Sequence, residues 1–129
     1  MEHSNDVYNR VMRDFCDMYY TDYDNNFYNL RELYTDNSLF TYMEEEAIGF
    51  DNYLSIIKNK GIQSFHHFDI RSVAQPVGNR SIIINIFGKL RINKSFIIHN
   101  FTETVFIKRN VHDNNYLVYN TIFTTIPKL

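Results

Sequence analysis

The sequence holds few of the residues that cross-link or break a chain. It has one cysteine, Cys16, two prolines and four glycines in 129 residues, and it has no tryptophan. A lone cysteine excludes an internal disulfide, and a reducing compartment is the simpler interpretation. The scarcity of proline and glycine favours long helices and strands with few tight turns. Residues 1–20 show no signal-peptide pattern, and no apolar run is long enough to span a membrane.

What the sequence does hold is apolar and aromatic. Hydrophobic residues make up 44% of the chain, and ten tyrosines and eleven phenylalanines supply the aromatic share. This composition excludes a disordered chain, and the length is enough to bury a core. We therefore predict a single domain over residues 1–129.

Charge is distributed unevenly. Residues 1–51 contain twelve acidic and three basic side chains, whereas residues 52–129 contain three acidic and ten basic ones. Two interpretations stay open: an acidic helical layer that complements a basic sheet within the molecule, or an acidic surface offered to a basic partner.

The hydrophobic period changes along the chain. Apolar residues recur at helical spacing from Val7 to Tyr19, from Phe27 to Tyr34, and between Asp51 and Gly61, which predicts three helices. We expect Asp51 and Gly61 to cap the two ends of the third helix. After Gly61 the period falls to two. We expect a short strand at residues 38–42 and long strands at residues 65–74, 81–92, 95–109 and 116–126. Helices that come first and strands that come last predict an α+β fold.

The long strands are apolar on both faces. In residues 81–92, Ile82, Ile84 and Ile86 share one face, while Ile83 and Phe87 lie on the other. Three helices can cover one face of a sheet, so we expect the second face to pack on another sheet in a homodimer. Gly88, in mid-strand, predicts a bend or a bulge.

An ordered set of short motifs runs through residues 8–126. It consists of Tyr19-Tyr20, Leu30-x-x-Leu33-Tyr34, Ser38-x-x-Thr41-Tyr42, Gly49, Gln75-Pro76, Gly88-x-Leu90 and Asn120-x-x-Phe123. This set resembles the nuclear transport factor 2 family and its superfamily. The resemblance implies a cone, in which three N-terminal helices pack on a strongly curved antiparallel sheet and the sheet forms the dimer interface.

The same resemblance implies a non-enzymatic carrier that works in the cytoplasm and the nucleus. Such a carrier binds the GDP form of the small GTPase Ran, together with Phe-Gly nucleoporin repeats. By position, the pocket for a partner's aromatic side chain falls on Tyr42, Phe65, Ile122 and Phe123. The nucleoporin-repeat contact falls on Tyr8.

The acidic rim of the family is displaced in this sequence. The positions expected to be acidic hold Met43, Asn93 and Ser95, and the nearest acids are Glu44, Glu45 and Glu46. Losing a charge pair from a half-buried rim costs about 2–5 kcal/mol of binding. A related role therefore stays open: an adaptor or heterodimer partner, of the messenger RNA export type, that binds other Phe-containing segments.

The superfamily also contains isomerases and dehydratases that move protons inside the cone. The residues here that suit a buried base are Glu103, or Asp69 together with His67. A small-molecule enzyme or binder is therefore the alternative from another class.

Metal and nucleic-acid sites have weaker support. Four of the five histidines, His66, His67, His99 and His112, lack the spacing of a zinc site, and no phosphate-binding glycine loop is present. We expect no cofactor and no metal. Basic residues on two strands leave RNA binding as a minor possibility.

Overall fold

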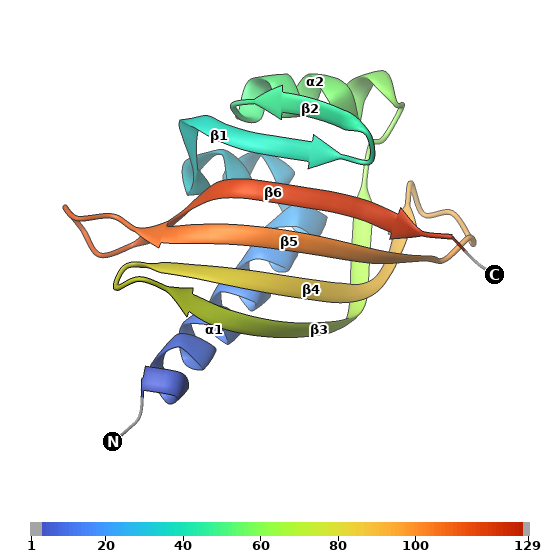
Figure 1. The fold of residues 1–129 in the computed structure, drawn as a ribbon. Coiled ribbons are helices and arrows are strands. Elements are labelled where there is room, and N and C mark those ends of the chain that lie inside the picture. Colours follow the sequence, from blue (N-terminus) through green and yellow to red (C-terminus); the bar gives the residue numbers. More distant parts are fainter. Residues whose placement is uncertain (1–3, 128–129) are drawn as a thin grey trace.

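The computed structural model describes residues 4–127, with side chains described from Val7 onward. Its helical segments are α1 (Ser4–Asn25), the 3-10 helix η1 (Phe27–Leu33) and α2 (Phe50–Asn59). Figure 1 shows all three behind one face of the sheet, with α1 crossing it diagonally. No helix in residues 4–127 is both long enough and apolar enough to cross a membrane.

Six strands form one curved sheet in the order β2-β1-β6-β5-β4-β3. They are β1 (Tyr34–Tyr42), β2 (Glu45–Ile48), β3 (Phe65–Val77), β4 (Ser81–Ile92), β5 (His99–Arg109) and β6 (Tyr116–Ile126). Neighbouring strands are antiparallel except β1 and β6, which are parallel. The α+β cone is thus confirmed, and the sheet is mixed at one seam.

Some boundaries differ from the sequence-based expectation. The second helix is a 3-10 turn that ends at Leu33, and residues 34–37 already belong to β1. Helix α2 begins at Phe50 behind Gly49, whose φ of 83° is accessible to glycine. The predicted cap Asp51 instead lies in the first turn of α2 and forms an ion pair with Arg31. Gly61 follows α2 with a φ of 73°, as a helix C-cap glycine should.

The core lies between the helices and the concave face of the sheet. Every second residue of the central strands points inward, and Ile84, Ile86, Phe101 and Val105 have no exposed surface. Tyr19 of α1 packs on them from the other side and is 1% exposed. Burial of these side chains, at about 25 cal/mol per Å² of apolar surface, is what fixes the helices on the sheet.

Gly88 marks a point of close approach, as its position in mid-strand predicted. The register between β3 and β4 shifts between Phe68 and Arg71, and Asp69 in this bulge has a φ of 52°. A Cβ on Gly88 would lie 2.7 Å from the Cδ1 atom of Ile70. The bulge turns Ile70 inward across the glycine, and the sheet bends there.

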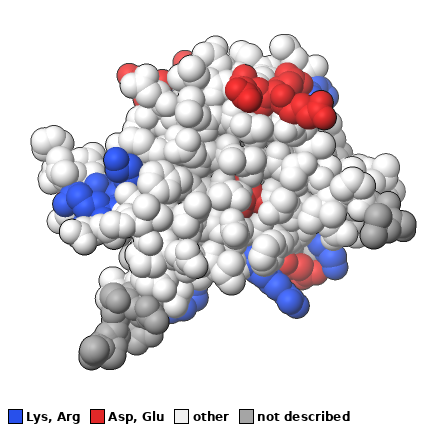
Figure 2. All heavy atoms as spheres, in the orientation of Figure 1, with Lys and Arg blue, Asp and Glu red and all other residues white. Residues whose placement is uncertain are grey.

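The convex face of the sheet carries no helix (Figure 1). Apolar side chains stand exposed on it, among them Ile83, Phe87 and Ile122, which are 37%, 42% and 54% exposed. Figure 2 views this face and shows few charged atoms over its centre. The two-faced apolar pattern of the strands is therefore real, and one of its faces is open to solvent in a single chain.

Candidate functional site

Tyr42 and Phe123 form an aromatic pair at the ends of β1 and β6. The two residues are register partners in the parallel seam, and their rings stack with centroids 4.8 Å apart. Both point into the core and are at most 5% exposed. Phe101 of β5 extends the stack, with its ring 5.8 Å from that of Phe123.

The other two residues predicted for this pocket lie elsewhere. Phe65 is buried, but its ring stacks on Phe27 at 5.8 Å, on the helical side of the molecule. Ile122 points to the convex face, because it alternates with the inward-facing Phe123. The structure therefore does not bring the four predicted residues into one pocket.

The acidic rim lies directly after Tyr42. Glu44, Glu45 and Glu46 are all exposed, on the turn before β2 and on β2 itself. Figure 2 shows acidic atoms gathered over this part of the molecule. Lys60 closes the space between rim and aromatic pair, because its Nζ atom lies 2.7 Å from the Glu45 Oε1 atom and 5.8 Å from the centre of the Tyr42 ring.

Asn93 has a structural role that its sequence did not reveal. Its Oδ1 atom accepts hydrogen bonds from the backbone N–H groups of Gln63 (2.6 Å) and Ser64 (3.1 Å). Its Nδ2 atom donates to the carbonyl oxygen of Gly61 at 2.8 Å. The side chain thus ties the connection between α2 and β3 to the β4–β5 turn, at a position where the family resemblance implied a rim acid.

Tyr8 lies on α1, half-buried against the core cluster. Its neighbour Val7 is 54% exposed. This end of α1 thus leaves apolar surface accessible, and a nucleoporin contact there stays a prediction.

Glu103 is a buried carboxyl at the centre of the fold. It is 2% exposed, and the alternation of β5 placed it correctly on the inward face. The Tyr20 hydroxyl donates to its Oε1 atom at 2.7 Å and the Tyr19 hydroxyl to its Oε2 atom at 3.3 Å. Tyr19 also shares a hydrogen bond of 3.0 Å with the Tyr34 hydroxyl. Burial raises the pKa of Glu103 from 4.5 to about 7, against the opposing effect of the two tyrosine hydrogen bonds.

The predicted couple of Asp69 and His67 is not formed. The β3 bulge turns Asp69 to solvent, where its Oδ2 atom lies 3.5 Å from the Lys89 Nζ atom. His67 points inward and its Nδ1 atom lies 2.6 Å from the Asp24 Oδ1 atom, and the His67 backbone N–H donates to the Asp24 Oδ2 atom at 2.9 Å. Burial lowers the pKa of His67, so the neutral ring donates its Nδ1–H to Asp24 and ties α1 to β3.

Cys16 is buried on α1 and chemically quiet. Its pKa is raised to about 11, first by burial and further by the charges of Glu103 and Asp17. A thiol with such a pKa is not a nucleophile at neutral pH, in agreement with the sequence-based interpretation.

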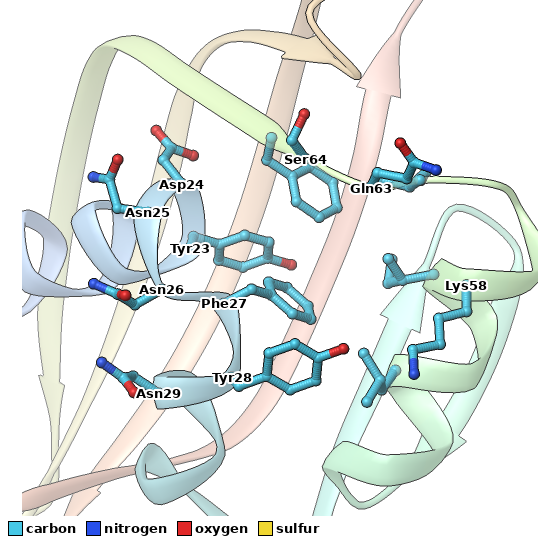
Figure 3. A pocket seen from close by; sticks show the side chains of 14 residues that line it. Tyr23, Asp24, Asn25, Asn26, Phe27, Tyr28, Asn29, Lys58, Gln63 and Ser64 are labelled. Atoms are coloured by element: carbon cyan, nitrogen blue, oxygen red, sulfur yellow. The ribbon is translucent and has the colours of Figure 1, made fainter.

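A groove of about 550 Å³ opens between the end of α1, η1, α2 and the start of β3 (Figure 3). Tyr42 and Phe123 do not line it. Its lining is aromatic and aliphatic inside and polar at the rim. The residues are Tyr23, Asp24, Asn25, Asn26, Phe27, Tyr28, Asn29, Leu54, Ile57, Lys58, Ile62, Gln63, Ser64 and Phe65.

With this geometry in hand, comparison with known proteins decides the family. The profile of the domain described as "Nuclear transport factor 2 (NTF2) domain" matches residues 11–125. The chain belongs to the nuclear transport factor 2 domain family. Among its relatives, a nuclear transport factor 2 from Candida albicans is 25% identical over 118 residues, which cover 90% of this chain and 93% of the relative. Another from Davidiella tassiana is 23% identical over 120 residues, covering 92% and 94% of the two chains.

Solved structures show the same fold. The nuclear transport factor 2 of Cryptosporidium parvum has a TM-score of 0.80 at 20% identity, covering 92% of this chain and 94% of that one. The yeast UBP3-associated protein BRE5 has a TM-score of 0.70 at 16% identity, covering 91% and 95%. A candidate scytalone dehydratase from Novosphingobium aromaticivorans has a TM-score of 0.73 at 17% identity, covering 95% and 87%. The fold thus occurs in carriers, in partner-binding proteins and in a protein named as an enzyme.

Proposed function

We propose that this protein is a non-enzymatic carrier of nucleocytoplasmic transport that moves between cytoplasm and nucleus. Its partners in this proposal are the GDP form of Ran and Phe-Gly nucleoporin repeats. The observation that carries the proposal is the family match over residues 11–125, together with an exposed acidic rim beside a buried aromatic pair. The relatives named nuclear transport factor 2 support it along nearly their whole length.

The rim suits a partner with basic residues. Glu44, Glu45 and Glu46 are consecutive and exposed, so they present up to three negative charges from one edge of the sheet. Exposed charges of this kind steer a basic partner and speed association more than they hold the complex. In this proposal the rim takes the place, by a shift of one to three positions, of the acid that the family resemblance placed at Met43; the acids that it placed at Asn93 and Ser95 have no such replacement.

An aromatic side chain of the partner reaches Tyr42 and Phe123 after Lys60 moves aside. Lys60 holds Glu45 and covers the Tyr42 ring, but it is 34% exposed and lies at the end of α2. A basic residue of the partner that pairs with Glu45 releases Lys60 from its carboxylate. Rim and aromatic pair are thus coupled through one lysine.

The convex face of the sheet is the proposed homodimer interface. It carries Ile83, Phe87 and Ile122 exposed, along with Val73 and Ile126, which are 57% and 47% exposed. A contiguous apolar face of this kind marks an interaction surface in a folded protein. The Tyr8 end of α1, on the other side of the sheet, is the proposed nucleoporin contact.

The experiment that tests the rim is association of Ran-GDP with a double variant, Glu44→Gln with Glu46→Gln. We expect association about 3- to 10-fold slower at low salt, because two steering charges are lost. The matched control, Glu32→Gln with Asp36→Asn, removes two exposed acidic charges from η1 and β1. An equal loss in both variants, or no loss in the first, contradicts the assignment of the rim.

Two observations favour other functions. The fold is shared with a yeast complex of the deubiquitinase Ubp3 and its Bre5 cofactor, at a TM-score of 0.69 and 13% identity, which supports an adaptor. Glu103 has a raised pKa and accepts hydrogen bonds from the hydroxyl groups of Tyr19 and Tyr20, as a proton-transfer site requires, and this supports an isomerase or dehydratase. Glu103 does not line the groove of Figure 3, so a substrate entering there meets other residues.

A further inference from the structure

The groove between the end of α1 and α2 is a second recessed surface, separate from the proposed Ran contact. One wall comes from residues 23–29 and the other from α2 and the segment that leads into β3. Asn93 fixes that segment by three hydrogen bonds to residues 61, 63 and 64. The groove is therefore bordered on one side by a segment whose backbone is held in place by the side chain of Asn93.

The inside of the groove is an aromatic surface. Figure 3 shows the rings of Tyr23, Phe27 and Tyr28 one above another, pointing from the η1 wall toward α2. Tyr23 and Phe27 meet edge to face at 5.2 Å and are anchored in the core. Tyr28 is 58% exposed, so a large aromatic surface faces solvent at the open end. A flat, apolar group of a ligand can therefore pack against the buried rings of Tyr23 and Phe27 and against the exposed ring of Tyr28.

One acidic and one basic side chain border the groove at opposite ends. Asp24, at the end near β3, accepts hydrogen bonds from both the neutral ring and the backbone N–H of His67, which hold its carboxylate in place but do not cancel its charge. Lys58, at the opposite end, is exposed and lies 6.0 Å above the Tyr28 ring centre, with no carboxylate within ion-pair distance among the described residues. The groove thus offers an aromatic centre with a cation beside it.

We infer that this groove docks a short segment of a partner protein that carries an aromatic side chain followed by an acidic one. The aromatic side chain packs between Phe27, Tyr28 and α2, and the acidic side chain pairs with Lys58. A protein segment fits better than a small molecule, because the polar groups stand exposed at the rim and do not converge on an enclosed ligand. Packing of a phenyl side chain in this groove of about 550 Å³ would bury roughly 150–250 Å² of its surface.

The groove does not depend on the Ran contact. Its lining shares no residue with the pair Tyr42 and Phe123 or with the rim Glu44, Glu45 and Glu46. A failure at one surface therefore leaves the other intact, and a carrier with both can hold two partners at once.

The test is a nuclear magnetic resonance titration of the ¹⁵N-labelled protein with the peptide acetyl-Gly-Ser-Phe-Asp-Ser-Gly-amide. We expect saturable shifts confined to residues 23–29 and 54–65. A peptide with Ala in place of Phe should lose the shifts. A peptide with Asn in place of Asp should bind about 3- to 10-fold more weakly, the loss expected for an exposed ion pair beside an aromatic ring.

Two variants make the result specific. Tyr28→Ala and Lys58→Glu change exposed side chains, so both should fold as the parent does. Lys58→Glu should weaken the Asp peptide and leave the Asn peptide nearly unchanged, whereas Lys94→Glu, on the β4–β5 turn, should change neither. Shifts centred on Tyr42 and Phe123, equal binding of the Ala peptide, or no saturable shift at about 5 mM peptide would overturn the inference.

Discussion

Replacing Glu103 with Gln should make the protein more stable at pH 8 and remove part of its pH dependence. Burial raises the pKa of Glu103 to about 7 in the folded state, above its ordinary 4.5. A carboxyl with a raised folded pKa contributes stability that is fully present below pH 4.5 and is lost as the pH rises through about 7. Above that pH the folded protein contains a buried, ionised Glu103, whose burial costs free energy.

The size of the effect follows from the rise in pKa. A rise from 4.5 to about 7 corresponds to about 3 kcal/mol of unfolding free energy once both states are ionised. Glutamine matches the protonated acid in shape. Its oxygen accepts from Tyr20, and its amide donates to Tyr19, which in turn donates to Tyr34. We therefore expect equal stability within about 1 kcal/mol at pH 4.5, and a gain of about 2–3 kcal/mol at pH 8.

Urea unfolding followed by circular dichroism, repeated between about pH 4.5 and pH 8, measures the difference. Burial lowers the pKa of His67 in both proteins, so its contribution to the pH dependence is common to them and cancels in the comparison. Glu46→Gln, the same substitution at an exposed position, is the matched control. A Glu103→Gln protein that is less stable at pH 8 would refute the reasoning, because it would mean that the carboxylate is the form the fold prefers.

Three further changes test the fold and its faces. Ile122→Asp places a charge on the convex sheet face and should convert the proposed dimer into a monomer, as measured by light scattering. Val111→Asp, which is also exposed but lies outside the sheet, should leave the dimer intact. A dimer that persists in Ile122→Asp would show that this face is not the interface. Gly88→Ala forces a Cβ against Ile70 and should lower the free energy of unfolding, measured in urea, by about 1–3 kcal/mol. In the double variant with Ile70→Ala, part of the Gly88→Ala loss should be recovered. Losses that simply add would contradict the close contact. Asn93→Gly keeps the positive φ but removes the three side-chain hydrogen bonds of Asn93, so the backbone amides of Gln63 and Ser64 should exchange hydrogen faster. Unchanged exchange would mean that these hydrogen bonds do not hold the segment in place.

Much of the fold followed from hydrophobic period alone. Strands β4 and β6 have the predicted bounds, because long alternating runs admit few other structures. The inward position of Glu103 followed from the same alternation. The alternation failed at Asp69, because a bulge opposite Gly88 turns the following residues to the other face. In the sequence only Gly88 indicated this bulge, and Gly88 lies on the neighbouring strand β4.

The candidate site was harder to predict, because its contacts join distant parts of the chain. Asp24 meets His67 across 43 residues, and Asn93 meets Gln63 across 30. Neither pair has a spacing that a sequence motif reveals. Family positions alone grouped Tyr42 with Phe65, yet the Tyr42 ring stacks on Phe123 and the Phe65 ring on Phe27. The groove itself depends on how far η1 and α2 stand apart, which packing decides.

The measurement that tests the central claim most directly is a calorimetric titration of the purified protein with Ran in its GDP and GTP forms. The account predicts micromolar or tighter binding that is selective for the GDP form, weakened by the change of Glu44 and Glu46 to glutamine. Absence of binding to either form, or equal binding to both, would contradict a Ran carrier and would mean that the fold serves another partner.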